Sequence, residues 1–596
     1  MKSPENLTQL FFNAIDRFSS KRAALRYKKD GVWHNITHFE LARQVRHAAL
    51  GLIELGTKPG DKVAILSANR PEWAVADYAC LTACCADVPV YPTIPPAQVA
   101  YILNDAGACT VFIADREQYE KIEIRRKDTP GVRHIIAFDE DVEGPDVISL
   151  QQLIQQGAAA ESKYPDYRET ACSVDPDSLA TLIYTSGTTG DPKGVMLSHN
   201  NITSNVIAGL KVIQIGPDDS CLSLLPLSHS FERMAGHYIM LHAGTTINYA
   251  ESAEQVPANL LETKPSIVLS VPRLFEKIYA RVLENAMAGS ALKRRIFFWA
   301  RRTAEAWGDL KLAGSTVPFR LATQKKLADR LVFAKLKART GGRIRFFVSG
   351  GAPLSPEIAR FFYAAGIPII EGYGLTETSP LIAVNPLEAP RIGTVGPAVP
   401  GVEVRIAQDG EILSRGPNVM RGYYNKPEAT SEAIDSEGWF HTGDIGELDA
   451  QGYIKITDRK KDIIVTAGGK NIAPQPIENK VKTNKFILNA VMVGDKRKFP
   501  IMLVVPDEEA VGRWAAERRI TIISNRLLTH PDVVAMVERE VMGNLRDLAS
   551  YEMPKKIVVV EQDFTIEDGE LTPTLKVKRK VVEEKHKNLI EQAYRE

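Results

Sequence analysis

A short apolar run followed by a loop of glycines, hydroxyl side chains and one lysine constrains the possible folds of this chain more than any other feature. Residues 180–184 read Ala-Thr-Leu-Ile-Tyr and predict a buried strand, and the residues that follow predict a tight loop. Glycines free backbone N–H groups, hydroxyls add donors and a lysine adds a mobile charge, a combination that suits a polyphosphate. The loop residues concerned are Thr185, Ser186, Gly187, Thr188, Thr189, Gly190 and Lys193.

This loop does not have the spacing of a Walker loop. A Walker loop needs Gly-x-x-x-x-Gly-Lys followed by Ser or Thr, whereas Lys193 follows Pro192 and precedes Gly194. A Walker-type kinase is therefore excluded. A run of glycine, serine and threonine is ordinarily a surface turn, so the function of this loop depends on which motifs accompany it downstream.

Length and composition set the broad class of the protein. At 596 residues the chain is long for one hydrophobic core, so two or more domains are expected. Its 44% hydrophobic and 25% charged residues are typical of a soluble globular protein. The six cysteines lack metal-ligand spacing and predict reduced, buried thiols in a cytoplasmic protein. The start of the chain lacks a signal-peptide pattern, and no run of about 18 apolar residues predicts a membrane span.

The small net charge hides a strongly basic segment. Between Ser290 and Arg345 there are fifteen Lys and Arg against three acids, which is +12, so the net charge of +1 leaves about −11 for the remainder. Such a segment could bind anionic lipid head groups at a membrane surface or a phosphate-bearing ligand. The alternative is a solvated helical face with no partner. A nucleic-acid partner is not expected.

Strand-like and helical stretches alternate along most of the chain. Apolar runs such as residues 62–66 and 267–270 predict buried strands, and Thr37 with Glu40 forms a capping box for a helix that ends at Gly56. Such alternation predicts parallel sheets flanked by helices. Ser355 and Pro356 are expected to begin another helix, as N-cap and first residue.

The pattern of apolar residues and glycines changes in the last third of the sequence. Short alternating pieces broken by glycine predict a compact β subdomain over 401–457, within a large N-terminal domain over 1–457. A polar junction, Arg-Lys-Lys-Asp, then leads into residues 458–596, which have enough strands and helices for a small α+β domain on a hinge. The predicted fold class is thus α/β with parallel and mixed sheets, a β subdomain and a small C-terminal domain.

Several motifs downstream of the loop could carry chemistry. A lone histidine such as His229 is ordinarily structural, but it can orient an acid by hydrogen bonding. The glycine pair Gly350 and Gly351 follows a predicted strand and would let a flat group approach the backbone, and Tyr373 offers a ring face to a purine. Asp444 could accept hydrogen bonds from two neighbouring hydroxyls, as a ribose presents them.

The loop and the motifs downstream of it, in this order, resemble the signatures of the adenylate-forming superfamily. These motifs lie at 226–233, 349–353, 372–379, 439–446, 459–461 and 571–579. This superfamily contains acyl-CoA synthetases, luciferases and the adenylation domains of peptide synthetases. The resemblance implies ATP, Mg²⁺ and coenzyme A as ligands. The strings at 228–233, 494–499 and 571–576, with the basic insertion, look most like long-chain acyl-CoA synthetases of the eukaryotic and bubblegum-like type.

The resemblance also implies a role for each matched residue. His229 and Thr376 would lie at the carboxylate and α-phosphate, Glu377 would bind Mg²⁺ together with Thr185, and Lys576 would be the catalytic lysine. Asp444 and Arg459 would hold the ribose and nucleotide, and Lys461 would be the pivot of the C-terminal domain. The adenine site would comprise Gly350, Gly351, Gly372, Tyr373 and Gly374. The backbone beside a pantetheine tunnel would be that of Gly468 and Gly469.

Two positions depart from the family pattern. The glycine that usually precedes the catalytic lysine is Leu575 here, and the neighbouring Lys578 and Lys580 compete with Lys576 for the assignment. Where some bacterial relatives carry a tryptophan gate in the acyl tunnel, this chain has Arg233, so the gate is not carried over.

The implied reaction joins a long-chain fatty acid to coenzyme A through an acyl-adenylate, with release of pyrophosphate and AMP. Three alternatives remain open at the level of sequence. The acid could be a medium-chain or aryl acid, the acceptor could be a carrier protein instead of coenzyme A, or the chain could be a scaffold at a lipid surface. The presence of Lys193, Glu377, Asp444, Arg459 and Lys576 together argues against the scaffold. Chain length of the acid and oligomeric state are not predicted.

Overall fold

The computed structural model describes residues 3–595 apart from 186–190, 468, 521–526, 567 and 573–575. Its N-terminal part contains two eight-stranded sheets, each mostly parallel with antiparallel strands at an edge. The first sheet has the order β18 (Gly422–Tyr423), β9 (Lys193–Ser198), β8 (Leu179–Thr185), β4 (Ala86–Val90), β3 (Lys62–Leu66), β5 (Thr110–Ile113), β6 (His134–Ala137) and β7 (Val147–Ser149).

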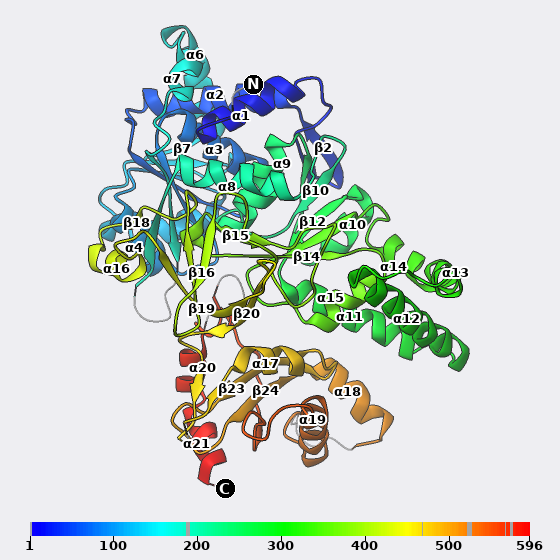
Figure 1. Ribbon diagram of the computed structural model, residues 1–596. Coiled ribbons are helices and arrows are strands. Elements are labelled where there is room, and N and C mark those ends of the chain that lie inside the picture. The colour runs from blue at the N-terminus through cyan, green and yellow to red at the C-terminus, as the bar shows by residue number, and fades with distance from the viewer. Residues whose placement is uncertain are drawn as a thin grey trace.

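Both faces of the first sheet are buried by helices. Val63 and Ile65 of β3 pack into one core cluster, whereas Ala64 and Leu66 pack into another on the opposite face. This alternation follows from the two-residue period of a strand. The helices around this sheet are α1 (Leu7–Phe18), α2 (His38–Glu54), α3 (Pro71–Thr82), α4 (Pro96–Ala106), α5 (Arg116–Glu123), α6 (Leu150–Ala159), α7 (Tyr167–Cys172) and α8 (His199–Val212) (Figure 1).

The second sheet lies next to the first and supplies most of the site described below. Its order is β15 (Leu381–Val384), β14 (Ile369–Gly374), β13 (Phe346–Ser349), β12 (Ile267–Ser270), β10 (Ser220–Ser223), β11 (Thr246–Tyr249), β1 (Leu25–Lys29) and β2 (Val32–Ile36). Its helices and helical turns are η3 (Glu232–Tyr238), α9 (Ile239–His242), α10 (Val256–Thr263), α11 (Pro272–Met287), α12 (Ala291–Leu312), α13 (Phe319–Ala328), η4 (Asp329–Phe333), α14 (Ala334–Arg339), α15 (Pro356–Ala364) and η5 (Thr376–Thr378).

The remaining elements form a smaller antiparallel sheet and a C-terminal α+β unit. The four-stranded sheet has the order β16 (Glu403–Ile406), β17 (Glu411–Arg415), β19 (Phe440–Leu448) and β20 (Ile454–Arg459), with α16 (Pro427–Ala433) nearby. The C-terminal unit contains β21 (Ile464–Val465), β22 (Asn471–Ile472), β23 (Ile487–Val493), β24 (Ile501–Pro506), β25 (Ile557–Val559), α17 (Pro474–Lys482), α18 (Glu508–Glu517), α19 (Pro531–Asn544), α20 (Arg579–Lys585) and α21 (Lys587–Arg595).

The predicted fold class is confirmed, and several elements agree closely with their sequence patterns. The capping box of α2 is present, since the Glu40 N–H donates to Thr37 Oγ1 and Thr37 N–H donates to the Glu40 carboxylate. Ser355 is the N-cap residue of α15 and Pro356 its first residue, as predicted, although the Ser355 side chain makes no capping hydrogen bond. Pro356 sets the backbone of the first turn, so this helix begins without a hydroxyl cap. The domain boundaries remain predictions.

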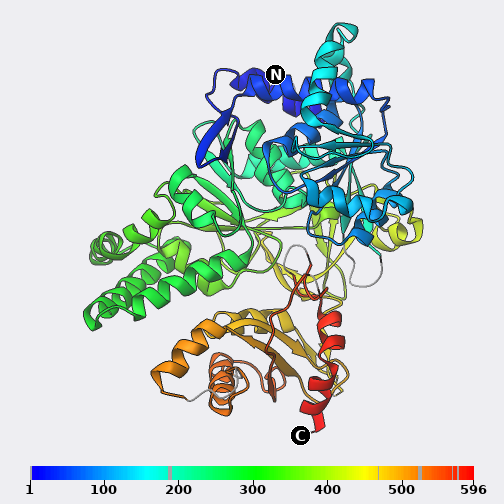
Figure 2. The same ribbon diagram turned by 180° about the vertical axis from the view of Figure 1, so that it is seen from behind.

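The basic segment is helical and extends away from the sheets. Helices α12, α13 and α14 project from one side of the molecule in both views (Figures 1 and 2). Among the described helices, none combines the length and the hydropathy that crossing a bilayer requires.

Candidate active site

The residues predicted to bind nucleotide converge on one large cavity. It has a volume of about 2660 Å³ and lies between the two large sheets, the four-stranded sheet and the C-terminal unit. The predicted residues that line it are Thr185, Lys193, His229, Gly350, Gly351, Gly372, Tyr373, Gly374, Thr376, Glu377, Asp444, Arg459, Lys461 and Lys576. Gly469 is not among the lining residues, and Ser186, Gly187, Thr188, Thr189, Gly190 and Gly468 lie outside the described residues.

The ends of the phosphate-type loop are fixed by strand pairing. Thr185 closes β8 and Lys193 opens β9, and the two residues face each other in the antiparallel register. The Lys193 ammonium lies 4.9 Å from the centre of the Tyr423 ring, and the Tyr423 hydroxyl donates to Glu377 Oε1 at 3.0 Å. Tyr423 thus links the lysine of the loop with the predicted metal ligand. Tyr423 was not among the predicted site residues, although two adjacent tyrosines follow Gly422.

His229 has a fixed tautomer in which one nitrogen remains available as a donor. The Phe231 backbone N–H donates to His229 Nδ1 at 3.1 Å, so a proton on a neutral ring resides on Nε2. Burial, with a smaller contribution from the Lys576 charge, lowers the pKa of His229 to about 3. His229 is therefore neutral at physiological pH and can donate from Nε2 to an anionic oxygen. Next to it, Ser230 Oγ lies 3.1 Å from Thr376 Oγ1.

Asp444 is held by two donors on adjacent elements. Strands β19 and β20 pair Asp444 with Arg459, whose Nε lies 3.0 Å from Asp444 Oδ1, and the Tyr373 hydroxyl donates to Asp444 Oδ2 at 2.8 Å. Asp444 raises the pKa of the Arg459 guanidinium. Since each carboxylate oxygen accepts more than one hydrogen bond, Asp444 can still accept from a pair of ligand hydroxyls.

Lys576 reaches this cluster from the C-terminal unit. Its backbone N–H donates to Thr572 Oγ1 at 3.0 Å, and Leu571 and Val577 form a β-bridge around it. The side chain is accessible to water inside the cavity, yet the protein atoms around it desolvate the ammonium. This desolvation, followed by the nearby Arg459 charge, lowers the pKa of Lys576 to about 8. Asp444 and Glu377 act in the opposite direction.

We expect a pH dependence from Lys576. Below pH 8 its ammonium is charged, and above pH 8 it loses its proton, so a step that needs this cation should slow as pH rises through about 8. The measurement is kcat/KM for ATP in acid-dependent pyrophosphate release, because this ratio reports the free enzyme. A profile that stays flat from pH 7 to about 9.5 would contradict the lowered pKa of Lys576, because a lysine with the ordinary pKa of about 10.4 remains charged over this range.

Comparison with known proteins identifies the family. Residues 11–424 match the family described as "AMP-binding enzyme", and residues 461–596 match "AMP-binding enzyme C-terminal domain". The chain belongs to the AMP-binding enzyme family. It is 40% identical to "Long-chain-fatty-acid--CoA ligase FadD15" of Mycobacterium bovis over 95% of this chain and 93% of that one. It is 32% identical to "Long-chain-fatty-acid--CoA ligase ACSBG1" of Bos taurus over 100% of this chain and 86% of that one.

Solved structures of AMP-binding enzymes share the fold. An anthranilate CoA ligase, AuaEII, in complex with anthranoyl-AMP matches with a TM-score of 0.75 and 18% identity over 99% of both chains. The adenylation domain of a carboxylic acid reductase from Segniliparus rugosus matches with a TM-score of 0.76 and 20% identity, over 100% of this chain and 94% of that one.

The junction between the two parts of this AMP-binding enzyme is anchored on one side. Lys460 Nζ lies 2.6 Å from Asp409 Oδ2 and 2.9 Å from Glu411 Oε2, both on the β16–β17 hairpin. Arg459 is held by Asp444, and Lys460 by the hairpin. Among the described residues, Lys461 is therefore the first of the junction that has no ion pair with the four-stranded sheet. This arrangement suits a pivot at Lys461.

A second buried acid lines the cavity. Glu371, in the middle of β14, accepts from the backbone N–H groups of Leu354 and Gly393, and burial raises its pKa to about 8. A protonated carboxyl can both donate and accept, which suits a neutral polar group such as a nucleobase edge. The sequence analysis passed over Glu371, although it directly precedes Gly372 of the predicted adenine site.

Proposed function

We propose that this chain ligates a long-chain fatty acid to coenzyme A with consumption of ATP, through an acyl-adenylate. The observation that carries the proposal is the convergence of His229, Glu377, Asp444, Arg459 and Lys576 on one cavity that continues into an apolar branch. The printed names of FadD15 and ACSBG1 support the same acid and acceptor.

The first half-reaction is an in-line displacement at phosphorus. A carboxylate oxygen of the acid forms a bond to the α-phosphorus, and the bond to the β-phosphate bridging oxygen breaks, so pyrophosphate leaves with the electron pair. Asp444 and Arg459 would hold the ribose, His229 would orient the acid from Nε2, and Lys576 would stabilise the charge that develops on the α-phosphate. In the second half-reaction the coenzyme A sulfur attacks the acyl carbon, AMP leaves and the thiol proton is released.

The residues at the phosphate end fit a magnesium ion. No group of three or more acidic, histidine or cysteine ligands occurs in the described part of the chain, and Glu377 supplies a single carboxylate beside Lys193. Mg²⁺ prefers one or two carboxylates plus substrate phosphates, so Glu377, with Thr185 nearby on the cavity wall, is the proposed holder. When bound, the ion would neutralise phosphate charge.

An apolar branch of the cavity suits a fatty acyl chain. It runs between α8 and the helix that begins with η3, and its walls are Ile213, Met234, Ala235, Ile239 and Met240. Burying each CH₂ of a ligand there would contribute about 0.8 kcal/mol. These five wall residues are all apolar, which favours a long acid over a polar one.

Gly209 of α8 should set part of the chain-length preference. A Cβ at this position would meet Ile239 Cδ1 at 3.0 Å and Leu381 Cδ2 at 3.7 Å, and both residues line the branch. We expect Gly209→Leu to lower kcat/KM for palmitate relative to octanoate roughly tenfold or more, since the side chain displaces two or three methylenes. Gly209→Ala should give a smaller shift in the same direction. An unchanged palmitate-to-octanoate ratio in a folded Gly209→Leu protein would exclude this branch as the acyl site.

The function is tested by measuring pyrophosphate and AMP release with ATP, Mg²⁺ and acids from acetate to arachidonate plus benzoate, with and without coenzyme A. Turnover that depends on coenzyme A and is fastest with long acids supports the proposal. Pyrophosphate release without stimulation by coenzyme A would indicate an acyl-AMP ligase with another acceptor. A preference for benzoate or medium acids would change the substrate, and no turnover would favour the scaffold.

We also propose that the enzyme is cytoplasmic and associates peripherally with a membrane through residues 290–345. The fifteen cations of this segment lie largely on helices that project from the molecule, where they can approach anionic head groups. A fatty acid partitions into bilayers, so such contact would bring enzyme and substrate together.

A further inference from the structure

A polar contact away from the catalytic cluster joins the N-terminal part of the enzyme to its C-terminal unit. Helix α11 follows β12 directly, and Arg273 lies in the first turn of this helix. Arg273 Nη1 donates to the Leu488 carbonyl oxygen at 2.7 Å and to Asn489 Oδ1 at 3.3 Å, both on β23 of the C-terminal unit. Arg273 therefore binds the unit that carries Lys576.

The two acceptors of Arg273 are oriented by the strand on which they lie. In the described part of the chain β23 is an edge strand, so its outer row of carbonyl groups has no strand partner. The register of β23 against β24 shifts between Ile487 and Asn489, which places Leu488 outside the regular pairing. The Asn489 amide nitrogen donates to the Asp563 carboxylate, so its amide oxygen is the atom that accepts from Arg273. The C-terminal unit thus presents two fixed oxygens to one guanidinium.

A second contact lies further along the same face of α11. Glu284 Oε1 lies 3.1 Å from Arg513 Nη2 of α18, which also belongs to the C-terminal unit. About three helical turns, or roughly 16 Å, separate Arg273 from Glu284, so their side chains leave the helix in nearly the same direction. In Figure 1, α11 lies on the side of the second sheet that is nearer the C-terminal unit. One face of this helix thus touches the unit at two places, β23 and α18.

The face of α11 between these two contacts is polar. Lys277 and Arg281 lie there, line the large cavity and are exposed. Polar groups exchange a protein partner for water at a small net cost, and interfaces between domains that move are more polar than permanent ones. The composition of this face therefore suits two parts that touch in one arrangement and separate in another.

We propose that Arg273 is a positioning residue for the first half-reaction. With a smaller contribution from Glu284, it holds the C-terminal unit in the arrangement that brings Lys576 into the cavity, here called the adenylating arrangement. A rotation about Lys461 would carry β23 away from α11, so the contact stabilises the adenylating arrangement and is lost when the unit turns. The proposal rests on the proposed function for the two half-reactions and on Lys461 as the pivot.

The two half-reactions distinguish positioning from a general structural role. Arg273→Ala should lower pyrophosphate release with palmitate and ATP roughly tenfold or more, because it removes the hydrogen bonds of a charged donor. Thioester formation from supplied palmitoyl-AMP and coenzyme A should be unchanged or faster, since the unit leaves the adenylating arrangement more readily. Arg273→Lys should recover part of the lost rate, because an ammonium can still donate to one of the two oxygens. Equal losses in both half-reactions would overturn the positioning role.

A double-mutant cycle tests whether Arg273 acts through β23. Asn489→Ala should also lower pyrophosphate release, because it removes one of the two acceptors. The double variant Arg273→Ala, Asn489→Ala should lose less than the two single losses combined, since both changes break the same contact. Fully additive losses would show that Arg273, which also lines the cavity, acts on a substrate instead, and the proposal would be wrong.

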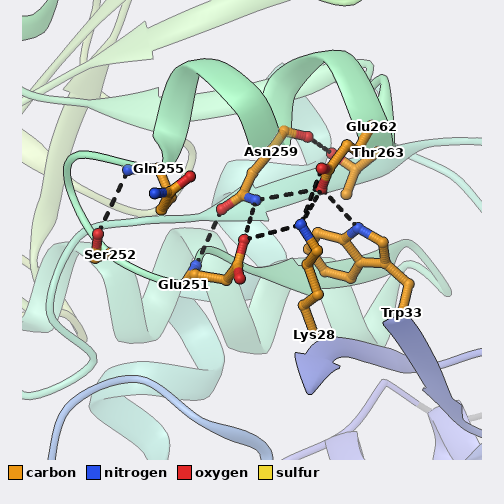
Figure 3. Close-up of polar contacts among 8 residues, drawn as sticks. All are labelled: Lys28, Trp33, Glu251, Ser252, Gln255, Asn259, Glu262 and Thr263. Carbon is orange, nitrogen blue, oxygen red and sulfur yellow. Dashed lines mark hydrogen bonds and ion pairs between the residues drawn. The ribbon is translucent and has the colours of Figure 1, made fainter. Parts of the chain in front are cut away.

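The ion pair with α18 is tested against a matched ion pair elsewhere. Glu284→Gln should lower pyrophosphate release roughly twofold and spare the second half-reaction. Its control, Glu262→Gln, breaks an ion pair within the N-terminal part, in which Glu262 of α10 lies 2.9 Å from Lys28 Nζ of β1 (Figure 3). The Glu284 and Glu262 side chains are 36% and 37% exposed, so the two changes are comparable. The same shift in the ratio of the two rates in both variants would contradict the role of α11.

Cross-linking tests whether the contact belongs to one arrangement only. In the variant Glu284→Cys, Arg513→Cys a short bismaleimide should join α11 to α18, and the two single variants control for the six native cysteines. The cross-linked protein should release one round of pyrophosphate with ATP and palmitate, and should form thioester from palmitoyl-AMP roughly a hundredfold more slowly or not at all. Thioester formation at the rate of the untreated variant would overturn the proposal.

The yield of this cross-link judges the contact without catalysis. Introducing Arg273→Ala into the double-cysteine variant should lower the yield roughly twofold or more, since fewer molecules are in the adenylating arrangement at any time. An unchanged yield would overturn the positioning role of Arg273. If the native chain releases no pyrophosphate with any acid, the proposed function fails instead, and the contact is still judged by this yield.

Discussion

Replacement of Lys576 by alanine should abolish formation of the acyl-adenylate and largely spare the second half-reaction. The ammonium is the C-terminal unit's contribution to a cluster whose other members belong to the four-stranded sheet and to η5. It interacts electrostatically with Arg459, Asp444 and Glu377. Loss of one preorganised charge at a developing anion lowers rates by roughly a hundredfold to a thousandfold. Pyrophosphate release with palmitate and ATP measures this step.

The second half-reaction provides the internal comparison. Supplied palmitoyl-AMP and coenzyme A should give thioester at a rate within about threefold of the native one, because Lys576 acts on the phosphate and not on the thiol. Since the backbone contacts of Lys576 with Thr572 do not involve its side chain, the variant should fold normally. Equal loss of both half-reactions would show that Lys576 is not specific to adenylation.

A matched control lies four residues along the chain. Lys580 of α20 also lines the cavity and is exposed, so Lys580→Ala removes the same charge and a similar side chain. We expect both half-reactions to be nearly unchanged in it. This comparison decides between the lysines that compete for the assignment in a segment where Leu575 replaces the usual glycine.

Much of the fold was predictable because its strands are buried on both faces. The runs 62–66 and 267–270 coincide with β3 and β12, since a short, mostly apolar stretch is typical of a strand buried on both faces. Asp444 and Glu377 each stand within a motif of their own, and both line the cavity; their roles there remain predictions. Tyr423 was missed because its contacts, Lys193 and Glu377, belong to other segments, and nothing in its local pattern indicates that they meet.

The basic segment illustrates a different limit of the sequence. The charge count predicts a cationic surface, but it treats every lysine alike. In the structure Lys325 is buried and pairs with Asp329, whereas Phe319 is among the most exposed side chains. Which residues of an amphipathic helix face outward depends on the helices packed against it, here α12. The combination of exposed apolar and cationic side chains therefore became visible only with the fold.

Arg233 was the least predictable residue. Arg233 stands at the position where some bacterial relatives carry the tryptophan gate of the acyl tunnel. Its side chain is nevertheless buried and does not line the cavity. Each of its five N–H groups has an acceptor: Nε donates to Tyr238 Oη, Nη1 to Asp87 Oδ1 and Thr181 Oγ1, and Nη2 to Asp77 and Asp87. A sequence gives no sign of this, because arginine is rarely buried and the acids lie on distant elements.

The Arg233 cluster joins the wall of the site to the first sheet. Asp77 belongs to α3 and Asp87 to β4, whereas Arg233 lies in η3, where its backbone N–H donates to the His229 carbonyl at 3.1 Å. The arginine therefore anchors the turn that presents His229 to the cavity. Burial raises the pKa of Asp77 to about 8, with Arg233 opposing this effect. Asp77 is thus largely protonated at neutral pH.

We expect Arg233→Met to lower the free energy of unfolding by about 3–5 kcal/mol, because it leaves buried acids without their cation. Without the opposing charge of Arg233, Asp77 would hold its proton to still higher pH in the folded state than in the unfolded state, where the pKa of an aspartate is about 3.9. The folded state therefore binds more protons, so the stability of the variant should fall as pH rises from about 5 to 8. Urea unfolding at several pH values measures both effects.

A second variant separates the loss of charge pairing from the loss of packing. Replacing all three charged residues, as Arg233→Met, Asp77→Leu and Asp87→Leu, removes the buried acids together with their cation, and should be less destabilising than Arg233→Met alone by about 1–4 kcal/mol. Its stability should decline less between pH 5 and about 8 than that of Arg233→Met, since no buried acid remains in the cluster to release a proton, whereas Glu371 still does so. If the triple variant is the less stable of the two, the hydrogen bonds of the cluster contribute more to stability than its charges cost. Arg233 would then hold the His229 turn mainly through the geometry of its hydrogen bonds.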